Sequence, residues 1–394
     1  MKKESQESSL KCEREPYLLT PGPLTTDVSV RSAMMRDWGS WDVGFQRLTK
    51  HIRSSVLKIL GSSEKNYECI PMQGSGSFAV ESMLGTFAPS NNKTLILANG
   101  AYGLRAARTM DYMKRPYRLL DKGDYLPPSA EEVESILKSD GTISHVFLVH
   151  CETSSGILNP LKEVATVTSE LGRHLLIDSM SAFGALEIDP IEVDFDVLVS
   201  SANKCIEGVP GFSFAIAKKE SLLASKGNSH SLCLDLYDQW EYMEKTGQWR
   251  FTPPTHVVAA FNEALKLHFS QGGSAGRLQR YTQNKNILVS GMRNLGFETL
   301  LSDPWLSPII VTFFYPSDKA FKFPFFYDLM KEKGFVIYPG KLTVADSFRI
   351  GCIGSFSSDV MEKAVKAVAE SLNQMGVKSA RPAETALQEK NKLQ

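Results

Sequence analysis

The first two thirds of the chain alternate between short apolar runs and longer amphipathic segments. Runs such as KTLILA, SHVFLVH and HLLID are typical of buried strands. Segments such as SFAVESMLGTFA and SAEEVESILKSD, which carry apolar residues at three- and four-residue spacing, are typical of helices. Alternating strands and helices predict βαβ units, and therefore a mostly parallel sheet with helices on both faces, over roughly residues 62–260.

The pattern changes further along the chain. Residues 257–296 predict two helices, and runs such as SPIIVTFFYP and SFRIGCIG beyond them predict a smaller α+β domain with an antiparallel sheet. We expect a polar, disordered leader (1–16), an extended arm with the large domain (17–275), a small domain (276–376), and a polar, frayed tail (377–394).

Composition narrows the class of protein. Lys plus Arg and Asp plus Glu number 44 each, so the chain as a whole has no electrostatic reason to bind nucleic acid or an anionic membrane. Neither a spanning segment of about 20 apolar residues nor a signal peptide is recognisable, and we expect a cytoplasmic protein. The six cysteines are scattered singly without metal-ligand spacing, so we expect reduced thiols and no metal site.

Three features could carry chemistry at the carboxyl edge of the predicted sheet. The loop QGSGSFAVES, residues 73–82, offers glycines, hydroxyls and a helix N-terminus that could hold a phosphate, although it is neither a Walker loop nor a dinucleotide fingerprint. Asp178 closes one strand, and Lys204 follows the next. Each feature also has an ordinary alternative: a turn before a helix, a capping carboxylate, and a solvated lysine past a strand.

Together these features fit one cofactor. A partly desolvated lysine loses proton affinity and can attack an aldehyde. Pyridoxal phosphate presents an aldehyde for Lys204, a ring nitrogen that Asp178 would keep protonated, and a phosphate for the glycine–serine loop. Arg349 could hold a substrate carboxylate or phosphonate through its guanidinium fork, or could bridge the two domains.

The motifs resemble those of class V of the fold-type-I pyridoxal phosphate aminotransferases. The likeness extends from Tyr17 to about Gly376 and rests on LLTPGPLTT, RDWGSWD, QGSGSFAVES, NGAYGLR, HCETSSGILNP, IDSMSAFGA, SANKCIEGVPGF, FTPPTHVV and FRIGCIG. It implies an α/β fold, in which a mostly parallel seven-stranded sheet lies between helices and a smaller α+β domain follows. It also implies a homodimer.

The resemblance implies a role for each matching residue. Lys204 would form the Schiff base and move the proton, Asp178 would pair with the ring nitrogen, and Arg349 would bind the substrate anion. The other cofactor contacts that it implies are the phosphate ligands Ser75, Gly76 and Ser77, the ring-stacking Tyr102, Thr153 at the ring hydroxyl, and Thr252, which the neighbouring subunit sends to the phosphate.

The finer pattern of DWGSWD, NGAYG and GVPGF resembles enzymes of phosphonate catabolism within this class. It implies that 2-aminoethylphosphonate and pyruvate are converted to phosphonoacetaldehyde and L-alanine. Trp41 stands where a basic residue is expected, and Ser77 stands in place of threonine. Three alternatives stay open: an alanine–glyoxylate or serine–pyruvate aminotransferase, an ammonia-lyase acting on 1-hydroxy-2-aminoethylphosphonate, and a non-catalytic anion-binding protein.

Overall fold

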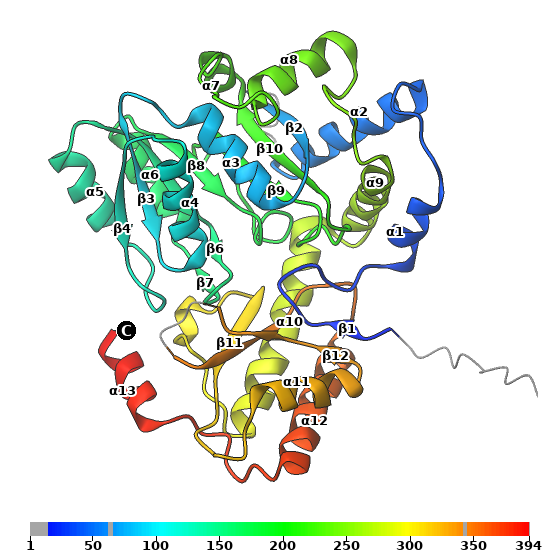
Figure 1. Cartoon of the computed structure of the whole chain (residues 1–394), viewed down its shortest axis with the longest axis vertical. Coiled ribbons are helices and arrows are strands. Elements are labelled where there is room, and N and C mark those ends of the chain that lie inside the picture. The colour runs from blue at the N-terminus through cyan, green and yellow to red at the C-terminus, as the bar shows by residue number, and fades with distance from the viewer. Residues whose placement is uncertain (1–14, 62–65, 342–344, 394) are drawn as a thin grey trace, which may run out of the picture.

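The computed structural model describes residues 15–61, 66–341 and 345–393. They form a larger part and a smaller part, and the long helix α10 (Gly273–Asn294) runs from one into the other (Figure 1). The predicted leader, residues 1–16, lies outside the described residues except for its last two. Within the described ranges, no helix combines the length and apolarity needed to cross a membrane.

A seven-stranded sheet forms the centre of the larger part, in the order β2-β10-β9-β8-β5-β3-β4. The strands are β2 (Tyr67–Gln73), β3 (Lys93–Ala98), β4 (Tyr117–Asp121), β5 (Ile143–Val149), β8 (His174–Asp178), β9 (Val197–Ser201) and β10 (Phe212–Lys218). β10 is antiparallel to β9 and β2, and the remaining neighbours are parallel. The predicted mostly parallel sheet of seven strands is confirmed.

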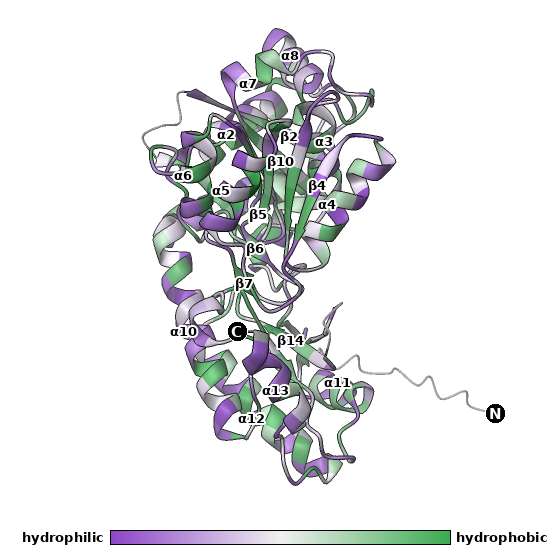
Figure 2. Cartoon of the chain, turned by 90° about the vertical axis from the view of Figure 1, so that its left-hand side faces the viewer, coloured by the Kyte–Doolittle hydropathy of each residue, from purple (hydrophilic) through white to green (hydrophobic). Residues whose placement is uncertain are grey.

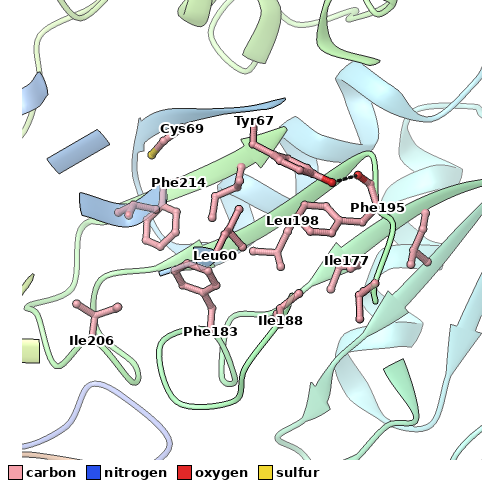
Figure 3. Close-up of a cluster of buried hydrophobic side chains, with 14 of the residues drawn as sticks. Leu60, Tyr67, Cys69, Ile177, Phe183, Ile188, Phe195, Leu198, Ile206 and Phe214 are labelled. Carbon is pink, nitrogen blue, oxygen red and sulfur yellow. Dashed lines mark hydrogen bonds between the residues drawn. The ribbon is translucent and has the colours of Figure 1, made fainter. Parts of the chain in front are cut away.

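Successive residues of a strand enter cores on opposite faces of this sheet. In β5, Val146 and Leu148 belong to one buried cluster, whereas Phe147 and Val149 belong to another. Figure 2 shows the central strands in the hydrophobic colour, and Figure 3 shows part of the first cluster. Because both faces are covered, the strands are apolar throughout rather than alternating.

Helices cover both faces of the sheet (Figure 1). The first cluster takes side chains from α2 (Val43–Lys58), α5 (Ala130–Ser139), α6 (Leu161–Glu170) and α9 (Thr255–Ser270). The second takes them from α3 (Gly76–Phe87), α4 (Ala101–Tyr112), α7 (Lys219–Ala224) and α8 (Leu236–Thr246). Local signals fix several helix starts: Ser129 and Glu132 form a capping box on α5, and Asp42 caps α2.

The smaller part contains a three-stranded antiparallel sheet in the order β11-β14-β13. Its elements are β11 (Ile310–Phe314), α11 (Phe323–Glu332), β12 (Phe335–Val336), β13 (Tyr338–Pro339), β14 (Ser347–Gly351) and α12 (Ser358–Met375). The remaining short elements are β1 (Tyr17–Leu18), α1 (Val28–Ser32), η1 (Ala33–Met35), β6 (Cys151–Glu152), β7 (Ile157–Leu158) and η3 (Asp303–Trp305). A separate buried cluster fills this part, as an α+β domain requires.

The first and the last described segments of the chain both contact the smaller part. β1 of the arm pairs with β12, so the arm that we grouped with the large domain begins on the small one. The predicted boundary after residue 275 falls within α10. The expectation of a frayed tail was wrong: residues 384–393 form helix α13 (Glu384–Leu393), and Lys390 Nζ donates to the Thr299 carbonyl at 2.8 Å.

Candidate active site

The strand ends bring the predicted chemistry to one edge of the large sheet. Asp178, the last residue of β8, is in register with Val149 of β5 and Val199 of β9. Lys204 lies three residues beyond the end of β9. Because neighbouring parallel strands end at the same edge, the carboxylate and the amine meet there.

One cavity of about 270 Å³ collects most of the predicted site. Seven predicted residues line it: Ser75, Gly76, Ser77, Tyr102, Thr153, Asp178 and Lys204. They come from the starts of α3 and α4, the turn after β6, and the ends of β8 and β9. Residues far apart in the sequence therefore form one pocket.

Lys204 is a cavity residue rather than a solvated surface lysine. Its Nζ donates hydrogen bonds to the carbonyls of Pro21 at 2.6 Å and Gly22 at 3.3 Å, both in the N-terminal arm. The approach requires glycine, because Gly22 has φ +100° and a Cβ there would lie 2.4 Å from the Asn203 carbonyl oxygen. Burial lowers the pKa of Lys204 to about 8.

Asp178 is a buried carboxylate that forms no direct ion pair with a described residue. Its side chain is 4% exposed, and one carboxylate oxygen accepts a hydrogen bond from the Met180 amide at 3.0 Å. Burial, with a smaller contribution from the charge of Glu152, raises the pKa of Asp178 to about 6, although the Met180 amide and the charge of Lys204 act in the opposite direction. A carboxylate in this position would be stabilised by a cationic group bound in the cavity.

The start of α3 presents the features of an anion site. Ser75 is the N-cap residue, yet its hydroxyl makes no capping hydrogen bond, so the simple capping turn does not describe this loop. Gly76 lies so close to Met180 that a Cβ would approach the sulfur to 2.6 Å. Ser77 Oγ accepts a hydrogen bond from Arg105 at 3.1 Å. Free amides, hydroxyls and a guanidinium therefore converge where the helix dipole is positive.

Two site residues were not predicted, although both lie in motifs that drew attention. Arg105, from NGAYGLR, lines the cavity, and its Cζ lies 4.8 Å from the Tyr102 ring centroid. Glu152, from HCETSSG, is fully buried and accepts hydrogen bonds from the amides of Tyr102 at 3.1 Å and Gly103 at 3.2 Å. Glu152 thus holds the start of α4, and with it the aromatic ring, against the cavity.

Arg349, from the smaller part, lies next to the cavity but is not one of the residues that line it. It lies on β14 with 4% exposure, and it donates from Nη1 to the Thr153 carbonyl at 2.7 Å and from Nε to the Pro339 carbonyl at 3.0 Å. The guanidinium therefore sits directly behind a lining residue and also bridges the two parts of the chain. Both alternatives that the sequence left open for Arg349 are compatible with this position.

Thr252 lies apart from the cavity of its own chain. It is exposed in the segment before α9 and is absent from the residues that line the pocket. Trp41 is 80% exposed. Neither residue contributes to the cavity that one chain forms by itself.

Comparison with known proteins identifies the family. The model of the class-V aminotransferases matches residues 45–317. A 2-aminoethylphosphonate–pyruvate transaminase from Rhizobium meliloti is 60% identical over 96% of this chain and 99% of its own. A second protein of that name, from Paraburkholderia xenovorans, is 59% identical over 96% and 97%.

A solved structure shows the same architecture. Pyridoxamine–pyruvate aminotransferase from Mesorhizobium loti superposes with a TM-score of 0.84 over 96% of this chain and 97% of that one, at 21% identity. At that identity the likeness concerns the fold alone, whereas the family model spans most of the chain that forms the cavity. The chain therefore belongs to the class-V aminotransferase family.

Proposed function

We propose that this protein transfers the amino group of 2-aminoethylphosphonate to pyruvate, which gives phosphonoacetaldehyde and L-alanine. The observation that carries the proposal is the meeting of Lys204, Asp178 and the start of α3 around one cavity. The chain is also 60% identical, over nearly its whole length, to a protein with that named activity.

The residues of the cavity fit pyridoxal phosphate, the cofactor of this family. The α3 N-terminus with Ser75 and Ser77 offers donors for its phosphate, and Arg105 adds a cation beside them. Asp178, buried and without a direct ion pair among the described residues, matches a protonated ring nitrogen. Tyr102 offers a ring face, and Thr153 would lie at the ring hydroxyl.

Lys204 is suited to act as both acid and base. When bound, pyridoxal phosphate supplies an electron sink for the carbon that carries the amino group. A pKa of about 8 leaves part of the Lys204 amine unprotonated near neutral pH, so Nζ can accept the proton from that carbon. The carbonyls of Pro21 and Gly22 accept hydrogen bonds from the resulting ammonium, which keeps it within the cavity.

Arg349 would hold the anionic end of each substrate. Its guanidinium fork can bind two oxygens of a phosphonate in one half-reaction and the carboxylate of pyruvate in the other. The Thr153 and Pro339 carbonyls fix the guanidinium from behind, which leaves less side-chain freedom to lose on binding.

We further propose that the working form is a homodimer. Thr252 is exposed and outside its own cavity, as expected of a residue that completes the phosphate site of a second chain. Phe251, beside it, is a large apolar residue with 39% exposure, which a subunit interface would cover. The described cysteines are all unpaired, which supports a reducing, cytoplasmic location.

An amino-donor assay tests the proposed reaction. Purified protein loaded with pyridoxal phosphate is supplied with 2-aminoethylphosphonate and pyruvate, and alanine is measured. We expect alanine with the wild-type protein and a loss of at least about a thousandfold with Lys204→Ala, because the amine that moves the proton is gone.

The controls separate the other reactions. Lys138→Ala, on the exposed face of α5, should keep full activity. Ammonia from 1-hydroxy-2-aminoethylphosphonate in the absence of pyruvate would instead indicate the lyase. Glycine formed from alanine and glyoxylate, or alanine formed from serine and pyruvate, without turnover of 2-aminoethylphosphonate, would indicate the other aminotransferase class. Full turnover by Lys204→Ala would overturn the role of the lysine.

A further inference from the structure

Three cationic side chains gather around Tyr102 at the edge of the cavity. Arg105 Cζ lies 4.8 Å and Lys341 Nζ 5.0 Å from the centroid of the Tyr102 ring. Burial lowers the pKa of Lys341, and the charges of Arg105 and Arg349 lower it too, against the opposing charge of Glu152. Cations that repel one another in a partly desolvated place indicate a site for anions.

The nearby carboxylate does not neutralise this cluster through direct contact. Glu152 accepts hydrogen bonds from the Tyr102 and Gly103 amides and from the amide and hydroxyl of Ser154. Within the described ranges, Lys341 forms no hydrogen bond or ion pair with a carboxylate. Its ammonium lies over the Tyr102 ring without a carboxylate in direct contact, so it can still pair with an anion bound beside that ring.

The position of Lys341 in the fold pairs it with Arg349. β13 and β14 are hydrogen-bonded neighbours in which Tyr338 is in register with Arg349. Lys341 follows β13 after two residues. Arg349 therefore lies on β14 and Lys341 in the segment that follows the neighbouring strand β13, while Arg105 comes from α4 and lines the cavity.

The ligand charges can be assigned to separate cations. Arg105 bonds to Ser77 at the start of α3, so its charge goes with the cofactor phosphate. A carboxylate carries one negative charge, which the fork of Arg349 alone can match. A phosphonate dianion carries a second charge and a third oxygen, which the fork leaves without a cation.

We propose that Lys341 is the specificity-determining residue that binds the third oxygen and second charge of the phosphonate, and so selects phosphonate over carboxylate donors. This inference rests on the proposed function and names the basis of its substrate choice. A lysine suits the task because its compact ammonium on a flexible stem can engage the dianion and release the smaller carboxylate of the second substrate.

Single-turnover kinetics test the proposal. The holoenzyme is mixed with 2-aminoethylphosphonate or with L-alanine alone, and the change of its visible absorbance is followed. In Lys341→Gln we expect kcat/KM to fall about tenfold or more for the phosphonate and less than about twofold for alanine. Lys341→Arg, which keeps the charge, should retain most of the preference, and Lys331→Gln, on the exposed face of α11, should match the wild type.

A binding experiment separates the effect of ligand charge from the effects of ligand shape and of the reaction itself. Titration calorimetry compares ethylphosphonate with ethanesulfonate, which is also tetrahedral but carries a single charge. Lys341→Gln should weaken ethylphosphonate about tenfold and ethanesulfonate clearly less, because the sulfonate offers a third oxygen but no second charge. Equal losses for both anions, or for both amino donors, would overturn the assignment of Lys341. A wild-type protein that fails to react with 2-aminoethylphosphonate would instead overturn the proposed function.

Discussion

Asp178 is expected to lower the stability of the cofactor-free protein and to raise that of the protein with cofactor bound. Its carboxylate is almost completely buried, and the amide of Met180 is its hydrogen-bond partner. Burial of an unpaired charge is unfavourable, which is why the pKa of Asp178 rises to about 6 from 3.8. A cationic ring nitrogen would reverse this effect, because it favours the ionised carboxylate.

The pH dependence of stability follows from this shift. The folded-state pKa of Asp178 lies above the unfolded value, so the folded chain binds the proton more tightly and loses stability as the pH rises from 3.8 to about 6. We compare Asp178→Asn with the wild type, both without cofactor. The free energy of unfolding of the variant minus that of the wild type should be about 2 to 3 kcal/mol larger at pH 7 than at pH 4.

Bound cofactor should reverse the order of stability of Asp178→Asn and the wild type. With pyridoxal phosphate bound, the wild type should be the more stable protein at pH 7, because only the carboxylate pairs with a charged ring nitrogen. Urea unfolding of both proteins, with and without cofactor, measures all four values. A variant that is less stable than the wild type in both states would contradict this account.

At the scale of elements, the turn after β9 is fastened to α10. Glu207, three residues after Lys204, has φ +61° and a buried side chain. Its carboxylate accepts hydrogen bonds from Arg277 at 2.5 Å, from Tyr281 at 2.6 Å and from Arg280. An unfavourable backbone conformation is thus held by a buried ionic cluster, which fixes the segment that carries the lysine.

Removing the charge of Glu207 should loosen this attachment. Glu207→Gln preserves the size of the side chain but leaves Arg277, which is 1% exposed, without its anion. We expect a loss of about 3 kcal/mol or more in the free energy of unfolding, measured in urea. Glu134→Gln, which breaks the exposed pair with Lys138 on α5, should cost less than about 1 kcal/mol. Equal costs in the two variants would refute the role given to the cluster.

Sequence reasoning succeeded where the signal was local or periodic. The order of strands and helices followed from apolar spacing, and Lys204 and Asp178 stood out because each follows an apolar run. The Glu207 cluster was missed because Glu207 lies 70 or more positions before each of its three partners. The carbonyl of Pro21 was missed for a different reason. Every residue has a backbone carbonyl, so the sequence does not indicate which one accepts a hydrogen bond from Lys204.

The tail was mispredicted for a similar reason. ETALQEKNKL is polar and read as a frayed end, but Ala386 and Leu387 pack against the buried cluster of the smaller part. Two apolar side chains are enough to hold a short helix when they pack against an existing core. Tertiary contacts, which the local sequence does not reveal, decide such cases.

At the scale of the whole molecule, one chain forms most of a cavity and holds Thr252 away from it. If Thr252 completes the site of a second subunit, each site needs Lys204 from one chain and Thr252 from the other. Subunits that carry Lys204→Ala and subunits that carry Thr252→Ala would then complement each other, because one of the two sites in the mixed dimer contains both native residues.

Subunit mixing tests this arrangement. Each variant alone should be weak, Thr252→Ala through poorer retention of pyridoxal phosphate, whereas the mixture after refolding should regain part of the wild-type activity at limiting cofactor. Light scattering checks the mass of the wild-type particle. A particle of one chain, or a mixture that shows only the average of the two variants, would contradict the shared site.

The first described residues to be synthesised are held in place by residues that are synthesised near the end of the chain. β1 pairs with β12, the Gly351 amide donates to the Leu19 carbonyl at 2.9 Å, and the next turn supplies the carbonyls that hold Lys204. During translation the arm must therefore wait, without its partners, until more than 300 further residues have left the ribosome. The amine can thus exist in an otherwise folded large domain before its carbonyl partners arrive, and closing this long loop becomes the step that completes the catalytic centre.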